Sequence, residues 1–289
     1  MKKFIKDILA QIDYLLYRVG IKKGHIKVYT VDETINELIN TSKSMVRFGD
    51  GEITMIRGRS LKLQQTNPQI IEELKRILGY QYDNLIVTIP DIFDDLSIYR
   101  KESRQFWKDH LLFSRKIYEK YCNKNKNYYS TSVSRFYLTY YSKEKSTLWA
   151  EGIRNIWKDK DVVIVEGERT HNGVGNNLLD LAKMVERIIG PGSNAYDKVD
   201  EIFEYCQIYS KDKLFLISLG AAAKPLTEKL FLAGYRVLDI GNLDMEYEWY
   251  LHGAVQKDKL AKHDCVSIDD NIKAGYGEYL KQIVARIEN

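Results

Sequence analysis

The 289-residue sequence contains few prolines, few cysteines and no long apolar run. Four prolines exclude a proline-rich linker or stalk. Its three cysteines, Cys122, Cys206 and Cys265, are far apart and form no C-x-x-C pair, which argues against a disulfide framework and a cysteine zinc site. We therefore expect a protein of the reducing cytoplasm.

Neither sign of charge predominates strongly, because the chain has 44 basic and 40 acidic residues and a net charge of only +4. This excess is too small and too dispersed to predict a nucleic acid partner. Tyrosine, in contrast, is abundant, with 21 residues that recur over 118–141 and 235–250. A flat apolar ring with a polar tip suits sugar rings and interfaces, and equally suits half-buried strands.

Residues 1–24 have the spacing of an amphipathic helix. Its apolar positions are Phe4, Ile5, Ile8, Leu9, Ile12, Leu15, Leu16 and Val19. Interrupting charges exclude a secretory signal or a membrane span, and basic residues outnumber acidic ones. Such a helix could make a peripheral contact with an anionic membrane, or dock on its own domain or on a second subunit of a homo-oligomer.

Strand and helix patterns alternate from residue 26 onward, without a further domain boundary or a repeat. The predicted strands are 26–31, 44–48, 84–89, 128–133, 161–165, 214–219 and a last one at 236–240. The predicted helices are 33–40 with Asp32 as N-cap, 68–78, 97–121, 147–158, 177–189, 198–209 and 225–233. This order predicts an α/β fold with a Rossmann-like, doubly wound, mostly parallel sheet, in a single catalytic domain over residues 25–289.

Ligands of such folds bind at the carboxyl ends of the strands, so the loops there are the candidate sites. The first loop carries Asp50 and Glu52, which alternate with Gly49 and Gly51, and the two glycines permit a tight turn. In an extended segment the two carboxylates would point the same way and could bind Mg²⁺ or Mn²⁺ together with a diphosphate, and Arg47 could neutralise a phosphate. A surface turn rich in glycine and aspartate is the alternative.

The second loop, residues 166–177, links strand 161–165 to the predicted helix 177–189. A glycine-rich loop at a helix N-terminus, here capped by Asn177, can bind phosphate or carboxylate. Leu178 at the third glycine position excludes the dinucleotide fingerprint, and no GK[ST] follows to make a P-loop. A plain turn would need fewer polar residues.

Two further loops follow strands. Around Gly220, the small residues of LGAAAK would let a base or ribose approach the backbone, or would serve helix packing. In the fourth loop Asp244, Glu246 and Glu248 alternate with apolar residues, so an extended segment would place all three on one side. Their repulsion favours a bound cation or one raised pKa suited to a general base, unless they form the solvated face of an edge strand.

The chain resembles the GT-D type bacterial glycosyltransferases, a family once known only as a domain of unknown function. RFGDGE at 47–52, EGERT…GVGN at 166–176 and GYRVLDIGNLDMEYEW at 234–249 carry the resemblance, together with LIVTIPDIF and SRFY, and it covers about residues 26–255. The resemblance implies sugar transfer from a nucleotide donor, with Asp50 and Glu52 binding metal and diphosphate. The donor-binding residues expected on this basis are Arg47, Gly49, Gly51, Arg135, Glu166, Glu168, Arg169, Gly173, Gly175, Asn176 and Gly220.

This chain departs from the family pattern at four positions. The family usually has Arg at His171, Asp at Asn177, Thr at Ala222 and His at Asn242. These departures leave the identity of the donor and the level of activity open.

We therefore expect a metal-dependent glycosyltransferase that uses Mn²⁺ or Mg²⁺ and a nucleotide sugar, with UDP as the expected nucleotide. The acceptor would be a glycan, a glycoprotein or a lipid-linked sugar, and one of Asp244, Glu246 and Glu248 would be the base. The residues alone would equally fit a phosphohydrolase, a nucleotidyltransferase, or a non-catalytic module that binds a glycan or a nucleotide sugar.

Overall fold

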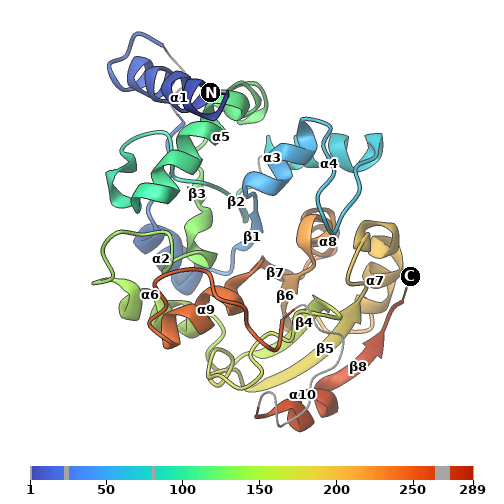
Figure 1. Ribbon diagram of the computed structural model, residues 1–289. Coiled ribbons are helices and arrows are strands. Elements are labelled where there is room, and N and C mark those ends of the chain that lie inside the picture. The colour runs from blue at the N-terminus through green and yellow to red at the C-terminus, as the bar shows by residue number, and fades with distance from the viewer. Residues whose placement is uncertain (1, 23–25, 80–81, 264–273, 289) are drawn as a thin grey trace.

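The computed structural model describes residues 2–22, 26–79, 82–263 and 274–288. Its named strands form one parallel sheet in the order β3-β2-β1-β7-β6-β4-β5-β8 (Figure 1). The strands are β1 (Ser44–Arg47), β2 (Leu85–Ile89), β3 (Tyr129–Ser130), β4 (Asp161–Gly167), β5 (Met184–Gly190), β6 (Leu214–Ser218), β7 (Arg236–Asp239) and β8 (Ile283–Arg286). The predicted α/β fold with a parallel sheet is confirmed.

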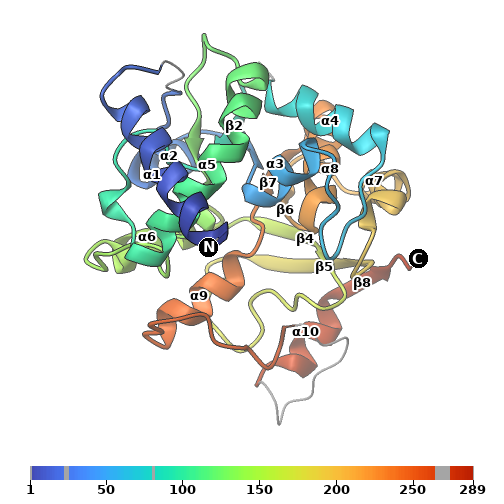
Figure 2. The same cartoon turned by 45° about the horizontal axis from the view of Figure 1, so that its top comes forward.

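Helices cover both faces of this sheet, as a doubly wound fold requires. They are α1 (Lys2–Arg18), α2 (Val31–Asn40), α3 (Asp50–Ile56), α4 (Pro68–Leu78), α5 (Lys101–Tyr121), α6 (Ser146–Asn155), α7 (Val199–Cys206), α8 (Ala223–Leu232), α9 (Leu243–Leu251) and α10 (Tyr276–Gln282). On one face α8 packs on α4 and α7, and α5 packs on α3 and α4. Figure 2 shows α4, α7 and α8 on one side of the sheet and α9 and α10 on the other.

The order in which strands are added to the sheet reverses between β1 and β7, at its centre. β1 leads to β2 and β3 on one side, whereas β7, which pairs with β1 at Met45 and Leu238, is followed by β8 at the opposite edge. Such a reversal leaves a crevice at the carboxyl ends of the two strands, where ligands of doubly wound folds bind. The fold therefore points to the segments after β1 and β7.

Buried apolar strands explain why most elements could be predicted. Every residue of β2 and β6 is buried, which is the pattern of strands covered on both faces. Helix α4 begins as expected, with the Asn67 side chain accepting a hydrogen bond from Ile70 N and Pro68 in the first turn. Helix α2 begins earlier than predicted, because Thr30 rather than Asp32 is its N-cap and forms a capping box with Glu33.

Four predictions about elements were wrong. The strand expected at 128–133 is reduced to β3, because Thr131–Ser134 form a 3-10 turn. Residues 177–189 are not a helix, since residues 168–183 form a loop and β5 follows, paired in parallel with β4 along its whole length. The apolar residues of this segment fit both the 3.6-residue period of a helix and the two-residue period of a strand. In the structure Ile188 and Ile189 are buried in the sheet, so the segment is a strand. The strand at 236–240 is not the last, because β8 extends the edge of the sheet beside β5. Residues 26–31 contribute only a single bridge, from Val28 to Tyr128.

The two acidic segments also differ from expectation. The expectation of extended segments is wrong, because Asp50 and Glu52 lie in the first turn of α3, and Asp244 and Glu246 lie in the first turn of α9. Neighbours at i and i+2 of a helix point in different directions, so the carboxylates of each segment separate.

Cys122 and Cys206 are buried free thiols, and Cys265 lies outside the described residues. Among the described helices, none combines the length and the apolarity that crossing a bilayer requires.

Candidate functional site

Arg47 stands at the carboxyl end of β1, in the central crevice. Its side chain is buried, and its Nε has no hydrogen-bond partner among the described residues. A Cβ on Gly241 would lie 2.8 Å from Arg47 Nη1, so this glycine makes room for the guanidinium, whereas a Cβ on Gly49 would be in ordinary contact with Nη2 at 3.5 Å. A buried cation with an unpaired donor is a candidate contact for an anionic group such as phosphate.

Glu52 faces away from solvent and is neutralised by a lysine from α8. Lys224 Nζ lies 2.8 Å from Glu52 Oε1 and 3.1 Å from Asp239 Oδ2, and all three side chains are buried. Glu52 Oε2 accepts a hydrogen bond from Gly49 N at 2.7 Å. Burial alone would raise the pKa of Glu52, but Lys224 and Arg47 lower it from 4.5 to about 2. Burial raises the pKa of Asp239, although Lys224 counteracts this.

The depressed pKa makes Glu52 a source of acid sensitivity. Its stabilising effect is complete above pH 4.5, the unfolded value, and is lost as pH falls toward about 2, which corresponds to about 3 kcal/mol. The pKa of Asp239 is raised rather than lowered, so protonation of Asp239 stabilises the fold as pH falls and offsets part of the loss. In Glu52→Gln this contribution is absent. We therefore expect its deficit in unfolding free energy, measured with urea, to shrink from pH 6 to pH 2.5.

Glu151→Gln, a change at an exposed carboxylate of α6, serves as the control and should show a small difference at every pH. A deficit of Glu52→Gln that stays constant over this range would contradict the role given to the ion pair.

Asp50, in contrast, is exposed at the start of α3. No group of three or more His, Cys, Asp or Glu side chains suited to a metal ion exists in the part of the chain that is described. Glu52 does not fit a direct ligand, because Lys224 and Gly49 N occupy its oxygens. Asp50 fits the other common arrangement, in which one carboxylate and substrate phosphates together bind Mg²⁺ or Mn²⁺.

Arg135 and Glu246 form a second charged pair beside this crevice. Glu246 Oε1 accepts hydrogen bonds from Tyr137 N, at 2.9 Å, and from Leu138 N, while Oε2 lies 3.7 Å from Arg135 Nη1. Burial lowers the pKa of Arg135, and Glu246 and Asp50 counteract this whereas Arg47 adds to it. Arg135 is therefore within electrostatic reach of Arg47 and Asp50, which joins three predicted site residues in one place.

Asp244 and Glu248 form a separate cluster around Lys262. Lys262 Nζ lies 2.6 Å from Asp244 Oδ2 and 2.9 Å from Glu248 Oε1, and His263 Nε2 lies 2.9 Å from Asp244 Oδ2. Burial alone would raise the pKa of both carboxyls, but Lys262 lowers it, most strongly at Asp244. The expectation of a raised pKa in this acidic group is therefore wrong for these two residues.

This cluster holds the loop that follows β4. Asp244 Oδ1 accepts hydrogen bonds from Gly173 N and Asn176 Nδ2, both at 2.8 Å, and Asn176 Nδ2 also lies 2.6 Å from Glu248 Oε1. Gly173 needs its small size, because its φ is +77° and a Cβ would lie 2.6 Å from Leu179 Cδ1. The carboxylates of α9 thus fix the backbone of this loop. The helix that was predicted to follow the loop is absent and does not contribute.

Glu166 fixes the other end of the same loop. Its Oε1 lies 2.6 Å from Arg187 Nη1, and its Oε2 accepts hydrogen bonds from Asn172 N at 2.8 Å and Asn172 Nδ2 at 2.7 Å. Glu166 is fully buried, so the structure places it as a support of the loop rather than on its surface.

The remaining predicted donor residues lie at the surface of these loops. Gly175, Arg169 and Gly220 are exposed, and Glu168 and Gly51 are partly exposed. Arg169 Nε lies 3.6 Å from Glu168 Oε1. A hollow of about 760 Å³ lies beside the loop, and its lining includes Gly173, Gly175, Asn176, Arg187 and Tyr279.

The four positions that depart from the family pattern differ in burial and in their contacts. His171 is buried, with Nδ1 2.7 Å from Lys262 O and its ring against those of Tyr276 and Tyr279. Asn177 Oδ1 accepts a hydrogen bond from Tyr247 Oη at 2.7 Å. Ala222 is buried, and Asn242 is exposed at the N-cap of α9.

Sequence reasoning missed three residues that contact carboxylates of the site, Lys224, Lys262 and His263. Lys224 could have been found, since it ends the LGAAAK segment after β6 and a buried carboxylate pair requires a cation. Lys262 and His263 are far along the chain from the loop that they hold, and no local pattern marks them.

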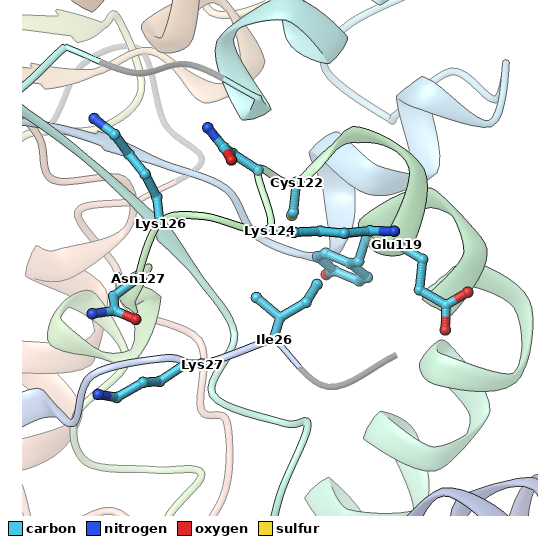
Figure 3. Close-up of a pocket in the computed structure, with 9 residues that line it drawn as sticks. Ile26, Lys27, Glu119, Cys122, Lys124, Lys126 and Asn127 are labelled. Atoms are coloured by element: carbon cyan, nitrogen blue, oxygen red, sulfur yellow. The ribbon is translucent and has the colours of Figure 1, made fainter. Parts of the chain in front are cut away.

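Another pocket lies far from these clusters, at the amino end of β3. Its volume is about 350 Å³, and Figure 3 shows Lys27, Lys126 and Asn127 on one side and Glu119 of α5 on the other. Burial raises the pKa of the Cys122 thiol in its wall to about 12, so this thiol is not a nucleophile at neutral pH. This pocket precedes β3, whereas the candidate site follows β1 and β7, so the two lie at opposite ends of the parallel strands.

Comparison with known proteins decides the family. Residues 45–267 match the family described as "Glycosyltransferase GT-D fold". The chain belongs to the GT-D glycosyltransferase family. It is 38% identical over 288 residues to glycosyltransferase GlyD of Streptococcus pneumoniae serotype 4, and 36% identical over 285 residues to a probable glycosyl transferase Gly of Streptococcus gordonii. These alignments cover 98% and 97% of this chain but only 35% and 42% of the two relatives.

Solved structures of the GT-D family have the same fold. A structure described as domain of unknown function 1792 with a distinct glycosyltransferase fold has a TM-score of 0.85 and 34% identity, covering 92% of this chain and 97% of that one. A glycosyltransferase of this family from Streptococcus sanguinis also has a TM-score of 0.85, with 35% identity, covering 91% of this chain and 100% of that one. The sequence resemblance to the GT-D family is thereby confirmed.

Proposed function

We propose that this GT-D chain transfers a sugar from a nucleotide-sugar donor to a glycan, glycoprotein or lipid-linked acceptor in the cytoplasm. One observation carries the proposal: the buried Arg47, with an unpaired Nε, stands at the carboxyl end of β1, where the strand order reverses. A diphosphate leaving group needs such a fixed positive charge, because negative charge grows on it as the sugar–phosphate bond breaks.

The donor diphosphate is proposed to bind between Arg47, Arg135 and Asp50. Both guanidiniums would stabilise the leaving diphosphate, and Asp50 would hold a divalent cation, which supplies further positive charge to the phosphates when bound. Lys224 and Glu52 support this arrangement by keeping the turn after β1 in place, since Glu52 accepts from Gly49 N. The nucleoside of the donor is expected to be uridine, placed along the loop at 168–176.

Glu246 is the base that we propose for the acceptor hydroxyl. Asp244 and Glu248 are less suited, because Lys262 lowers the pKa of both and their oxygens hold the loop. Glu246 Oε1 is fixed by two backbone N–H groups, which leaves Oε2 toward Arg135.

The acceptor is proposed to bind in an aromatic hollow formed in part by the segment that follows Tyr137 and Leu138. This hollow, of about 350 Å³, is lined in part by Asp91, Tyr140, Tyr141 and Trp149, and Tyr141 is exposed. Flat rings beside carboxylates suit sugars, which present apolar faces and hydroxyls. The same segment that donates to Glu246 at Tyr137 and Leu138 continues into this wall.

Release of nucleoside diphosphate tests the proposal. The chain is incubated with a panel of nucleotide sugars, Mn²⁺ and glycan or peptide acceptors, and release that depends on the acceptor is expected. Arg47→Gln should lower this release by roughly 10²-fold, as removal of one charge-stabilising donor does elsewhere, whereas Arg286→Gln on the exposed edge of β8 should not. Hydrolysis of phosphate esters without sugar transfer would favour a phosphohydrolase, and saturable binding without product would favour a binding module.

A further inference from the structure

Helix α1 is amphipathic, but it is attached by its polar face. Lys6 Nζ lies 2.5 Å from an Asp109 carboxylate oxygen, Lys108 Nζ donates to Gln11 Oε1 at 2.7 Å, and Tyr17 Oη donates to Glu119 Oε1 at 3.1 Å. All three partners belong to α5. The side of α1 that a soluble helix would turn outward is therefore the side that contacts the protein.

Aromatic contacts at the end of α1 strengthen this attachment. The Arg115 guanidinium stacks 3.5 Å from the centre of the Tyr17 ring, and Tyr14 Oη donates to Asp94 O at 3.1 Å. Contacts distributed from Lys6 to Tyr17 fix the rotation of the helix about its axis. Its orientation is thus set by these specific bonds together with burial of Ala10, and not by burial of its large aliphatic residues.

The opposite face of α1 is an uncovered apolar stripe. It consists of Phe4, Ile5, Ile8, Leu9, Ile12 and Leu15, with exposed fractions between 43% and 68%, and Val19 and Ile21 continue it at 66% and 72%. These positions follow helical spacing over the whole length of α1, which lies at the periphery of the molecule (Figure 1). A contiguous stripe of this kind is typical of a surface that binds a membrane or another protein.

Charge favours a membrane as the occupant. Both acidic residues of α1 lie toward the protein, where Asp13 is only 15% exposed and contacts Lys22, and Asp7 is partly buried. Lys3 and Arg18 are exposed near the two ends of the stripe, and Lys22 remains 45% exposed. The outward surface therefore combines apolar and basic groups without acidic ones, which complements anionic headgroups.

We propose that α1 binds the surface of an anionic membrane, with its apolar stripe at the level of the acyl chains and its basic groups among the headgroups. This proposal does not depend on the reaction of the central site. The helix lies in the plane of the interface, and the contacts with α5 carry the catalytic domain with it.

Vesicle binding tests the proposal on the full 289-residue chain. We expect co-sedimentation with vesicles of equal parts phosphatidylglycerol and phosphatidylcholine, and much weaker binding to phosphatidylcholine alone or at high salt. The double variant Ile5→Gln/Leu9→Gln should weaken binding roughly 20-fold, because about half of each side chain is left to bury. The matched change Leu148→Gln/Leu232→Gln, at exposed leucines of α6 and α8, should not.

Charge is tested separately. Lys3→Gln/Arg18→Gln should weaken binding about fivefold for each charge removed, whereas Lys158→Gln/Lys257→Gln should have no such effect. Absence of binding to anionic vesicles at low salt would overturn the proposal. So would a dimer, seen by sedimentation velocity, that dissociates in Ile5→Gln/Leu9→Gln, because the stripe would then be the interface with a second copy of the chain.

Discussion

Replacing Asp50 with alanine is expected to lower turnover by about 10²–10³-fold. A divalent cation on the leaving phosphates contributes several kcal/mol to the transition state, and each 1.4 kcal/mol or so corresponds to a factor of about ten in rate. Asp50 is exposed, so its removal leaves the packing of α3 intact. Initial rates of nucleoside diphosphate release with Mn²⁺ measure this effect.

Metal binding is also measured without turnover. Manganese paramagnetic resonance in the presence of UDP should show a bound cation in the parent chain and weaker binding in Asp50→Ala. Glu102→Ala, at an exposed position in the first turn of α5, is the control. Full activity in excess chelator, or an active Asp50→Ala variant, would remove the metal from the mechanism.

Changing Glu246 to glutamine is expected to lower kcat by about 10²–10⁴-fold, the usual contribution of a general base. The amide oxygen of glutamine can still accept hydrogen bonds from Tyr137 N and Leu138 N, so the segment around these two residues should keep its conformation. Donor affinity, measured by calorimetry, should change little because the base acts on the acceptor.

Glu248→Gln provides the contrast. Its carboxylate pairs with Lys262 and accepts from Asn176, which belongs to the loop after β4. We therefore expect this variant to weaken donor binding more than it lowers kcat. If Glu246→Gln keeps full kcat at saturating acceptor, the base lies elsewhere.

Much of the sheet could be predicted because parallel strands buried on both faces are continuous apolar runs, as in 161–165 and 214–219. The carboxyl-end loops of β1, β4 and β7 could also be selected, because the fold class alone says where ligands bind. The sequence signal was weaker at 184–190, where apolar spacing fits both a helix and a strand and only pairing with β4 decides between them.

Orientation of the acidic residues was the part that could not be predicted. Asp50, Glu52 and Asp244 begin helices, where acidic residues are favoured by the helix dipole, and this signal was available in the sequence. Which carboxylates are neutralised could not be deduced, since the cations Lys224 and Lys262 come from distant segments. Tertiary contacts, and not local spacing, decide which acids support the structure and which face a ligand.

The meeting of β1 and β7 has a consequence for how the protein is made. Arg47 N and Asp239 Oδ2, which lie 3.3 Å apart, are separated by 192 residues of sequence. At a synthesis rate of roughly 5–20 residues per second, Arg47 leaves the ribosome about 10–40 s before its partner. During that interval β1 has an unpaired edge, which can pair with other chains. The candidate site at the carboxyl ends of β1 and β7 thus forms only when the two ends of a long loop meet, and a ribosome-bound chain remains prone to aggregation until then.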